Sequence, residues 1–337
     1  MNRKIKKSER IFIAGANGMV GNSIKRNLIS SGYGLDEQKG LILTPSRQEL
    51  NLLNYHEVEN WFIKNKPTVV ILAAAKVGGI QANYSMPADF ILENLKIQNN
   101  VIENSLKANV KRFLFLGSSC IYPKYAKQPI KEEYLLEGPL ENTNEYYAIA
   151  KIAGLKLCEA LRHQYGFDAI SLMPTNLYGP GDNYHPKNSH VMAALISKFT
   201  KATIESNSFV ECWGSGEPLR EFLHVDDLGE AVVFCLENWD PKTENSPKDL
   251  YGNALNHLNV GTGKDISINQ LAKKIAALSG FKGKIIWDNT KPDGTPRKQL
   301  DISKITQLGW YPKITLDHGI KQTINLYKKI INYAMDV

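Results

Sequence analysis

Tyr147 and Lys151 are the residues whose types and spacing most directly indicate chemistry. Residues four positions apart share a face of a helix, so a helix here would hold the phenol and the ammonium side by side. A neighbouring cation favours phenolate and lowers the pKa of a tyrosine, which suits Tyr147 to proton transfer with a carbonyl or hydroxyl group. Ser118 directly follows the apolar run 112–117 and could hydrogen-bond the same carbonyl oxygen.

A glycine-rich segment supplies the second motif. Residues 15–21 read GANGMVG, follow the apolar run 10–14 and precede a helical stretch, which is the context that a dinucleotide-binding loop requires. In such a loop the first glycine permits a tight turn, the second lets the backbone approach a pyrophosphate, and the third allows close helix–strand packing. The helix N-terminus then faces the phosphates with free N–H groups. The cofactor-binding residues predicted here are Gly15, Asn17, Gly18, Met19, Val20 and Gly21.

The residues after the second predicted strand bear on the choice between NAD and NADP. An acidic residue at this position binds the ribose 2′-hydroxyl of NAD and repels the 2′-phosphate of NADP. The sequence reads LTPSR over 43–47, with no acid, so NADP is favoured and Arg47 is the predicted phosphate ligand. A solvent-facing Arg47 is the alternative, and a second basic residue before it would have strengthened the preference for NADP.

Alternating strands and helices must position these motifs. The predicted strands are 10–14, 41–44, 68–73, 112–117 and 169–174, and the predicted helices are 18–30, 55–65, 90–108 and 147–165. Strands that read as continuous apolar runs are buried on both faces, which is typical of a parallel sheet covered by helices on both sides. We therefore predict an α/β fold with a doubly wound, Rossmann-type parallel sheet over 10–175. Residues 176–337 should form mainly a smaller α+β lobe that binds substrate, with some segments returning to the first domain.

Length, composition and charge narrow the class of protein. The 337 residues are 43% hydrophobic and 22% charged, which excludes a disordered, collagen-like or coiled-coil chain, and the apolar runs are too short to span a membrane. More than half of the net charge of +7 falls in residues 1–10, so residues 1–9 are predicted to be a solvated basic tail, and nucleic-acid binding is not expected. The cysteines have neither zinc nor disulfide spacing, which fits a reducing cytoplasm. They are Cys120, Cys158, Cys212 and Cys235.

Nine segments, spread over nearly the whole chain, carry a resemblance to a known family. They are 73–80 (AAAKVGGI), 116–124 (LGSSCIYPK), 147–154 (YAIAKIAG), 173–180 (MPTNLYGP), 185–190 (HPKNSH), 213–216 (WGSG), 220–227 (REFLHVDD), 259–263 (NVGTG) and 291–298 (KPDGTPRK). With the glycine loop they resemble the extended short-chain dehydrogenase/reductase family, and within it the enzymes that act on GDP-linked 4-keto-6-deoxy sugars. The resemblance implies reduction by NADPH, with Ser118, Tyr147 and Lys151 as the reductase residues and Lys151 also contacting the cofactor.

The resemblance also gives Cys120 and His190 a role. The implied substrate, GDP-4-keto-6-deoxy-D-mannose, carries a ketone at C4 that acidifies the hydrogens at C3 and C5, so one base and one acid on opposite faces can epimerise both carbons. The family uses the cysteine of the GSSC segment and the last histidine of the HPKNSH segment for this purpose, and that histidine is also expected at the cofactor. From the residues alone, an inert buried cysteine and a surface histidine are the alternatives.

Family position implies the remaining ligand contacts. Pro174, Asn176 and Leu177 would place the nicotinamide. The predicted substrate-binding residues are Lys198, Trp213, Arg220, Asp293 and Lys298. Among these the two cations Arg220 and Lys298 suit a diphosphate, and the alternative for Trp213 is packing in the core. A homodimer through the helices at 90–108 and 147–165 is expected.

Two other functions remain open at this point. A related reductase or epimerase that acts on another nucleotide 4-keto sugar, dideoxy or heptose derived, would share most of these motifs. A non-enzymatic dinucleotide-binding protein is the third possibility, although such proteins commonly lose the tyrosine or lysine that this chain retains at 147 and 151.

Overall fold

The computed structural model describes residues 4–335 except 36, 38, 186–188 and 292. Its centre is a six-stranded sheet in the order β2 (Leu41–Leu43), β1 (Arg10–Ala14), β3 (Val69–Leu72), β4 (Arg112–Leu116), β5 (Ala169–Pro174) and β9 (His257–Val260), and every neighbouring pair is parallel. All residues of β3, β4 and β5 are buried, because helices cover both faces. The predicted doubly wound parallel sheet is confirmed, and the five strands predicted from the sequence agree with the observed ones to within one residue.

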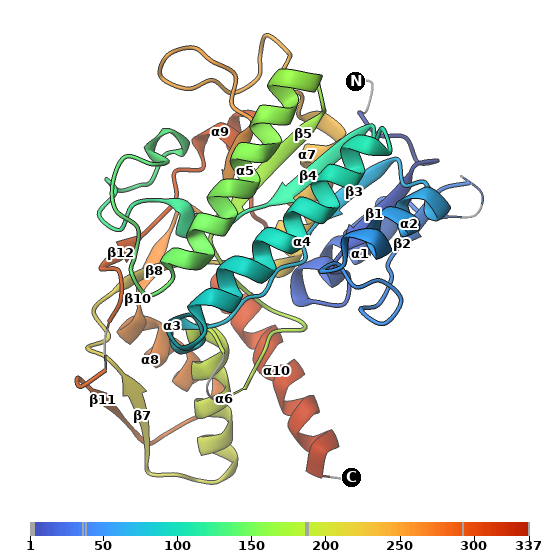
Figure 1. Cartoon of the computed structure of the whole chain (residues 1–337). Helices are drawn as coiled ribbons and strands as arrows, with labels where there is room; N and C mark the ends of the chain where they lie inside the picture. The colour runs from blue at the N-terminus through green and yellow to red at the C-terminus, as the bar shows by residue number, and fades with distance from the viewer. Residues whose placement is uncertain (1–3, 36, 38, 186–188, 292, 336–337) are drawn as a thin grey trace.

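Alternating side chains of the strands enter two cores. Ile11 and Ile13 of β1 lie in the core on one face of the sheet, whereas Phe12 and Ala14 lie in the core on the other. The first face is covered by α1 (Met19–Ser30) and α7 (Val225–Asn238), with the short α9 (Ser303–Gln307) beside β9. The other face is covered by α2 (Tyr55–Asn65), α4 (Pro87–Lys107) and α5 (Glu145–Tyr165), and α3 (Ile80–Ser85) leads into α4 (Figure 1). Within the described ranges no helix is both long and apolar enough to cross a membrane.

The C-terminal part of the chain adds a smaller group of elements, of which α6, α8, β7 and β11 lie below the large sheet in Figure 1. Its strands are β6 (Asn176–Tyr178), β8 (Leu219–His224), β10 (Asp265–Ser267) and β12 (Arg297–Lys298), which pair around β8, and β7 (Phe209–Trp213), which pairs with β11 (Lys284–Asp288). Its helices are α6 (Val191–Ile204), α8 (Ile268–Ser279) and α10 (Leu316–Met335), which share a third core. From β8 the chain runs directly into α7 and so returns to the large sheet.

The basic N-terminal segment packs on the fold, so the prediction of a solvated tail is wrong for its described part. Ile5 is buried, and the Lys4 backbone N–H donates to the Glu237 carbonyl at 2.9 Å. The Lys7 ammonium pairs with the Glu237 carboxylate at 3.0 Å and lies 3.4 Å from the centre of the Tyr33 ring. These partners come from α7 and from the segment after α1, so no pattern within the tail itself could reveal them.

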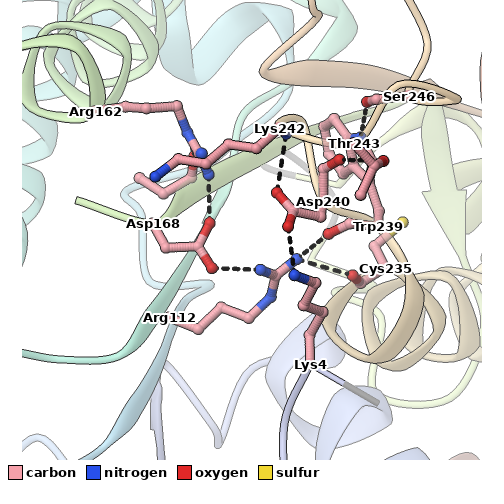
Figure 2. A network of polar contacts seen from close by, with 11 residues as sticks. Lys4, Arg112, Arg162, Asp168, Cys235, Trp239, Asp240, Lys242, Thr243 and Ser246 are labelled. Carbon is pink, nitrogen blue, oxygen red and sulfur yellow. Dashed lines mark hydrogen bonds and ion pairs between the residues drawn. The ribbon is translucent and has the colours of Figure 1, made fainter. Parts of the chain in front are cut away.

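A buried arginine ties two strands to the end of α7. Arg112 opens β4, and its guanidinium pairs with Asp168 and donates to the backbone carbonyls of Cys235, at 3.2 Å, and Trp239 (Figure 2). Arg162 of α5 pairs with the same Asp168 carboxylate. The Cys235 carbonyl also accepts the Trp239 backbone N–H at 3.1 Å, whereas the Trp239 carbonyl lies beyond the last turn, so Arg112 helps to satisfy the end of α7 while holding it on the sheet. This network lies at the amino ends of β4 and β5 and leaves the carboxyl ends for the functional site.

Candidate active site

The glycine loop between β1 and α1 contains two glycines that the fold itself requires. Gly15 has a φ of +89°, and a Cβ there would lie 2.7 Å from the Ala74 backbone nitrogen. A Cβ on Gly21 would lie 2.1 Å from the Gly15 carbonyl oxygen. By contrast, a Cβ on Gly18 would meet its nearest described neighbour at 3.5 Å, which is an ordinary contact. The bare backbone at Gly18 therefore fits the close approach of a group from outside the chain.

The start of α1 is open to an anion. Gly18 is the N-cap residue and offers no side-chain hydrogen bond, so the N–H groups of the first turn, those of Met19 and Val20 among them, have no partner within the helix. Asn17 lies exposed just before them. Free N–H groups and the positive end of the helix dipole attract phosphate. This loop fits the pyrophosphate of a dinucleotide.

Arg47 is exposed in the turn that follows β2. The neighbouring Ser46 is occupied, because its N–H donates to the Glu49 carboxylate at 2.7 Å and its hydroxyl accepts from the Glu49 N–H at 3.3 Å. Among the residues that the structure describes, none forms a hydrogen bond or ion pair with the Arg47 side chain. Its guanidinium is thus available to a phosphate at this end of β2.

The end of β4 and the first turns of α5 bring Ser118, Tyr147 and Lys151 together. Ser118 caps the short 3-10 helix η2 (Ser119–Ile121), and its hydroxyl accepts from the Cys120 N–H at 3.2 Å. The Ser118 side chain also lies near enough to the Tyr147 phenol to act on the pKa of that phenol. One turn further along α5, the buried Lys151 donates from its ammonium to the Leu116 carbonyl at 2.9 Å. The serine, tyrosine and lysine singled out from the sequence therefore form one group.

Burial sets the charge states in this group. It raises the pKa of Tyr147 well above its ordinary value, and the nearby Ser118 side chain offsets only part of that rise. Burial also lowers the pKa of Lys151 to about 8. The Lys151 nitrogen lies 5.8 Å from the centre of the Tyr147 ring and bonds to Leu116 instead. The expectation of a lowered tyrosine pKa is thus wrong here, and Tyr147 is a neutral phenol that can donate a proton.

Cys120 is half-buried, and its sulfur faces two N–H donors. The Asn144 amide nitrogen lies 3.2 Å from Sγ, and the Lys298 ammonium nitrogen lies 3.6 Å from it. Lys298 was expected at a diphosphate, and the structure places it against this sulfur. Sequence reasoning missed Asn144, although its position three residues before Tyr147 put it beside the same site. An inert core cysteine does not fit these surroundings.

His190 is the exposed N-cap residue of α6. Although the residue as a whole is exposed, partial burial of its ring lowers the pKa of the imidazole, which favours the neutral form at neutral pH. Residues 186–188 of the segment that carries it lie outside the described residues. In the remainder of the chain no contact joins His190 to Cys120, so the structure does not bring these two groups together directly.

Pro174 ends β5 at the carboxyl edge of the large sheet, and β6 begins two residues later. The Asn176 side-chain amide donates to the backbone carbonyl of Glu221 at 2.8 Å, which holds the start of β6 against β8. Leu177 packs partly against the core of the large sheet. Ligands of parallel α/β sheets bind at this edge, so the segment lies where a cofactor ring could reach it.

Glu221 is a buried residue to which the sequence assigned no role. Its carboxylate accepts from the backbone N–H groups of Thr262, at 2.5 Å, and Leu300, at 2.7 Å. It therefore fastens the NVGTG segment and the chain after β12 to β8. Because Arg220 and Lys298 are paired residues of β8 and β12, Glu221 fixes the backbone that presents both cations.

The Arg220 side chain contacts Asp293 and interacts electrostatically with Cys120. Its guanidinium donates to the Leu219 carbonyl at 2.9 Å and to the Asp293 carbonyl at 3.5 Å. Burial lowers the pKa of Arg220, while Glu141, Cys120 and Asp293 act in the opposite direction. An arginine keeps its charge under such shifts, so a cation lies within electrostatic reach of the thiol.

Trp213 is 53% exposed at the end of β7, so packing in the core is excluded. The ammonium groups of Lys198 and Lys291 lie 5.4 and 5.8 Å from the centre of its ring. The Asp293 carboxylate accepts from the backbone N–H and the hydroxyl of Ser215, each at 2.8 Å, and so shapes the turn after the tryptophan. An exposed aromatic face beside two cations suits a flat, anionic ligand. Lys291 is a further residue that the sequence did not single out.

The stretch that carries the glycine loop and the Ser118–Tyr147–Lys151 group can be compared with known families. Residues 11–251 match the family described as NAD dependent epimerase/dehydratase family. The chain belongs to this family. The resemblance inferred from the sequence motifs is thereby confirmed, and the family's dependence on a dinucleotide agrees with the open backbone at Gly18.

Relatives within the NAD-dependent epimerase/dehydratase family match nearly the whole chain. GDP-L-fucose synthase 1 of Arabidopsis thaliana is 52% identical over 323 residues, which cover 96% of this chain and 94% of that protein. Among solved structures, a GDP-6-OMe-4-keto-L-xylo-heptose reductase from C. jejuni is 37% identical, with a TM-score of 0.88 over 97% of this chain and 99% of its own. A GDP-L-fucose synthetase from Naegleria fowleri bound to NADP is 25% identical, with a TM-score of 0.84 over 98% of each chain.

Proposed function

We propose that this chain converts GDP-4-keto-6-deoxy-D-mannose to GDP-L-fucose as a bifunctional, NADPH-dependent 3,5-epimerase and 4-reductase. The observation that supports the proposal most directly is that the half-buried Cys120 bonds through its N–H to the Ser118 hydroxyl at 3.2 Å, with the Tyr147 phenol nearby. Ketone reduction uses the serine and the tyrosine, whereas a thiol at the same place offers a group for proton transfer at carbon. The 52% identity to a GDP-L-fucose synthase over nearly the full length supports the choice of substrate.

The cofactor of this proposal is NADPH, which supplies a hydride when bound. The open backbone at Gly18, the uncapped start of α1 and the free guanidinium of Arg47 fit its phosphates. The N. fowleri relative bound to NADP supports the same choice. The residues proposed to hold the cofactor are Gly15, Asn17, Gly18, Met19, Val20, Gly21, Arg47, Lys151, Pro174, Asn176, Leu177 and His190.

Reduction at C4 uses the hydroxyl pair at the end of β4. The raised pKa of Tyr147 keeps the phenol protonated, so it donates its proton to the C4 oxygen as the carbon receives hydride. Ser118 orients that oxygen by hydrogen bonding. The resulting phenolate is stabilised by the Lys151 ammonium, which lies one helical turn away.

Epimerisation precedes reduction, because the C4 ketone is what acidifies the hydrogens at C3 and C5. At each carbon one group removes the proton and a second returns one from the opposite face. We propose Cys120 and His190 for these two positions. The electron pair of the broken C–H bond moves to the C4 oxygen, where the Ser118 and Tyr147 hydroxyls donate hydrogen bonds to the enolate.

The nucleotide part of the substrate is proposed to bind along β7, β8 and α6. Arg220 and Lys198 supply cations for the diphosphate, and the exposed face of Trp213 supplies a surface for the guanine ring. Asp293 supports this surface through its hydrogen bonds to Ser215. Lys298 is near enough to Arg220 to share the diphosphate in the complex.

Deuterium incorporation tests the proposal. Turnover in D₂O with GDP-4-keto-6-deoxy-D-mannose and NADPH should give GDP-L-fucose labelled at C3 and C5, as read by NMR.

The similarity to the C. jejuni heptose reductase supports a second candidate function, namely a reductase or epimerase for another GDP-linked 4-keto sugar. A panel of dideoxy and heptose 4-keto sugars, followed by NADPH oxidation, discriminates the two. A higher kcat/KM for one of those sugars would replace the proposed substrate.

A homodimer through α4 and α5 is part of the proposal, as is a cytoplasmic location, which four free cysteines support. The two helices pack side by side on the large sheet and expose Leu92, Tyr146 and Ile149 to solvent, with 52%, 46% and 38% of each residue accessible. Unpaired apolar side chains on adjacent helices suit an isologous contact. Light scattering should give twice the mass of the chain, and Ile149→Lys should return it to the mass of one chain.

A further inference from the structure

The Cys120 sulfur is where side chains from separate parts of the chain meet. Asn144 approaches it from the start of α5, and Lys298 approaches it from β12, 178 positions along the sequence. We propose that Lys298 and Asn144 are positioning residues that stabilise negative charge on the Cys120 sulfur and so make it able to accept a proton from carbon. The chemical consequence of this inference rests on the proposed epimerase function, whereas the state of the sulfur does not.

The Asn144 side chain contacts the Cys120 sulfur instead of capping the helix that it precedes. Asn144 is the N-cap residue of α5, where asparagine usually accepts a backbone N–H of the first turn, yet its side chain makes no such bond. Its Nδ2 donates to the sulfur instead, and its Oδ1 is buried with no partner among the described residues. Buried unpaired polar atoms are rare in folded proteins and call for an explanation. Orientation of the amide toward the thiol provides one.

Lys298 is delivered to the sulfur by strand pairing. Its strand, β12, is only two residues long and pairs with β8, where Lys298 lies opposite Arg220. The Glu221 carboxylate fixes the chain just beyond it by accepting the Leu300 N–H at 2.7 Å. Ordering a lysine side chain costs conformational entropy. Because strand pairing and the bond to Leu300 already fix the backbone here, only the side chain of Lys298 has to be ordered.

The charges around the sulfur are mainly positive. Lys298 faces it from β12, and Arg220 acts on it from β8. Tyr147 faces it from α5 as a neutral phenol. The carboxylates of Glu141 and Asp293 act on Arg220 and offset part of its charge. Positive neighbours and a nearby helix N-terminus stabilise negative charge that develops on sulfur.

The thiolate gives the epimerisation a defined first step. Sulfur takes a proton from the carbon beside the C4 ketone, so that the C–H bond breaks, an S–H bond forms and the electron pair moves to the C4 oxygen. Return of a proton to the carbon from the opposite face completes the inversion. A Lys298 that served only as a diphosphate ligand would change substrate affinity and leave the thiol of the free protein unaltered.

The test measures the sulfur itself in the substrate-free protein. Cys120 is half-buried whereas Cys158, Cys212 and Cys235 are buried, so iodoacetamide should alkylate Cys120 selectively, and mass spectrometry reports each site. At neutral pH, Lys298→Met should slow alkylation of Cys120 by up to about fivefold, the factor that a unit charge near 4 Å is worth in a water-like medium. Lys298→Arg should stay near the wild-type rate, and Asn144→Leu should slow the reaction by roughly two- to fivefold, as one hydrogen bond requires.

Controls separate the outcomes. Continued protection of the three buried cysteines shows that each variant is folded, and Lys282→Met, an exposed lysine outside the site, should react like the wild type. Wild-type alkylation rates in both Lys298→Met and Asn144→Leu would overturn the inference. If the rates change as expected while the wild-type protein makes no GDP-L-fucose, the proposed function fails and the state of Cys120 stands. Where GDP-L-fucose is made, Lys298→Met should slow deuterium entry at C3 and C5 by the same factor as alkylation.

Discussion

Replacement of Gly18 by alanine should separate the stability of the glycine loop from its function. The added Cβ would lie 3.5 Å from its nearest described neighbour, so the fold accommodates it. Alanine is a poorer N-cap than glycine by about 0.5–1 kcal/mol. Against this, a less flexible unfolded chain returns about 0.4–1 kcal/mol. The free energy of unfolding should therefore change by less than about 0.5 kcal/mol.

Binding of NADPH to the Gly18→Ala protein should nevertheless weaken. The methyl group would occupy the approach to the first turn of α1, and loss of one charge-assisted hydrogen bond to a phosphate costs about 1.5–3 kcal/mol. That corresponds to a roughly 10- to 100-fold increase in Kd, which titration of NADPH fluorescence can measure.

Gly21→Ala is the matched variant with the opposite expectation. Its Cβ would lie 2.1 Å from the Gly15 carbonyl oxygen, and neither backbone can move aside without opening the contact between α1 and β1. We expect a loss of about 3 kcal/mol or more in the free energy of unfolding. Unaltered NADPH affinity in Gly18→Ala, or a loss of stability as large as that of Gly21→Ala, would refute the assignment of this loop.

Three further predictions address the sheet, the phenol and the buried lysine. Arg112→Met removes the side-chain donor to the Trp239 carbonyl and the cationic partner of the Asp168 carboxylate, so it should lower the free energy of unfolding by about 2–4 kcal/mol in a urea titration. Lys313→Met, which breaks an exposed ion pair, should cost less than about 1 kcal/mol, and equal effects would contradict the role of the buried network. Tyr147→Phe should slow steady-state NADPH oxidation by roughly 10²- to 10⁴-fold with NADPH affinity unchanged, and a variant as fast as the wild type would remove the phenol from the mechanism. Burial lowers the pKa of Lys151 from its ordinary value of 10.5 to about 8. Between these two pH values the lysine is protonated in the unfolded chain and mostly deprotonated in the folded protein. Stability of the wild type relative to Lys151→Met should therefore rise by roughly 2–3 kcal/mol between about pH 8 and pH 10, and a difference that stays flat would show that the ammonium is not desolvated.

The large sheet was predictable because its signals are local. Apolar runs such as VVIL in β3 and RFLFL in β4 must be buried on both faces, and the helical stretches between them leave a parallel arrangement as the simple solution. The short strands β6, β10 and β12 have no such signal. Each contains only two or three residues, and each exists because β8 offers it a partner.

Contacts between distant parts of the chain could not be predicted from the sequence. Lys298 matched a family position for a diphosphate cation, and nothing in its neighbourhood indicated that the β12–β8 pairing directs it to Cys120. The N-terminal lysines likewise read as solvated because their acidic partners belong to α7 and the segment that follows it. The positions of the motifs predicted which residues lie near the carboxyl edge of the sheet. The contacts between those residues depend on strand pairing in the smaller lobe, which the sequence does not show.

The isotopic pattern of one product tests whether the protein combines epimerase and reductase activities. The protein is incubated in D₂O with GDP-4-keto-6-deoxy-D-mannose and unlabelled NADPH, and the nucleotide sugar is examined by NMR. GDP-L-fucose is expected with deuterium at C3 and C5 and with protium from NADPH at C4. A reduced sugar that carries no deuterium at C3 and C5, or labelled sugar formed without NADPH oxidation, would contradict this expectation.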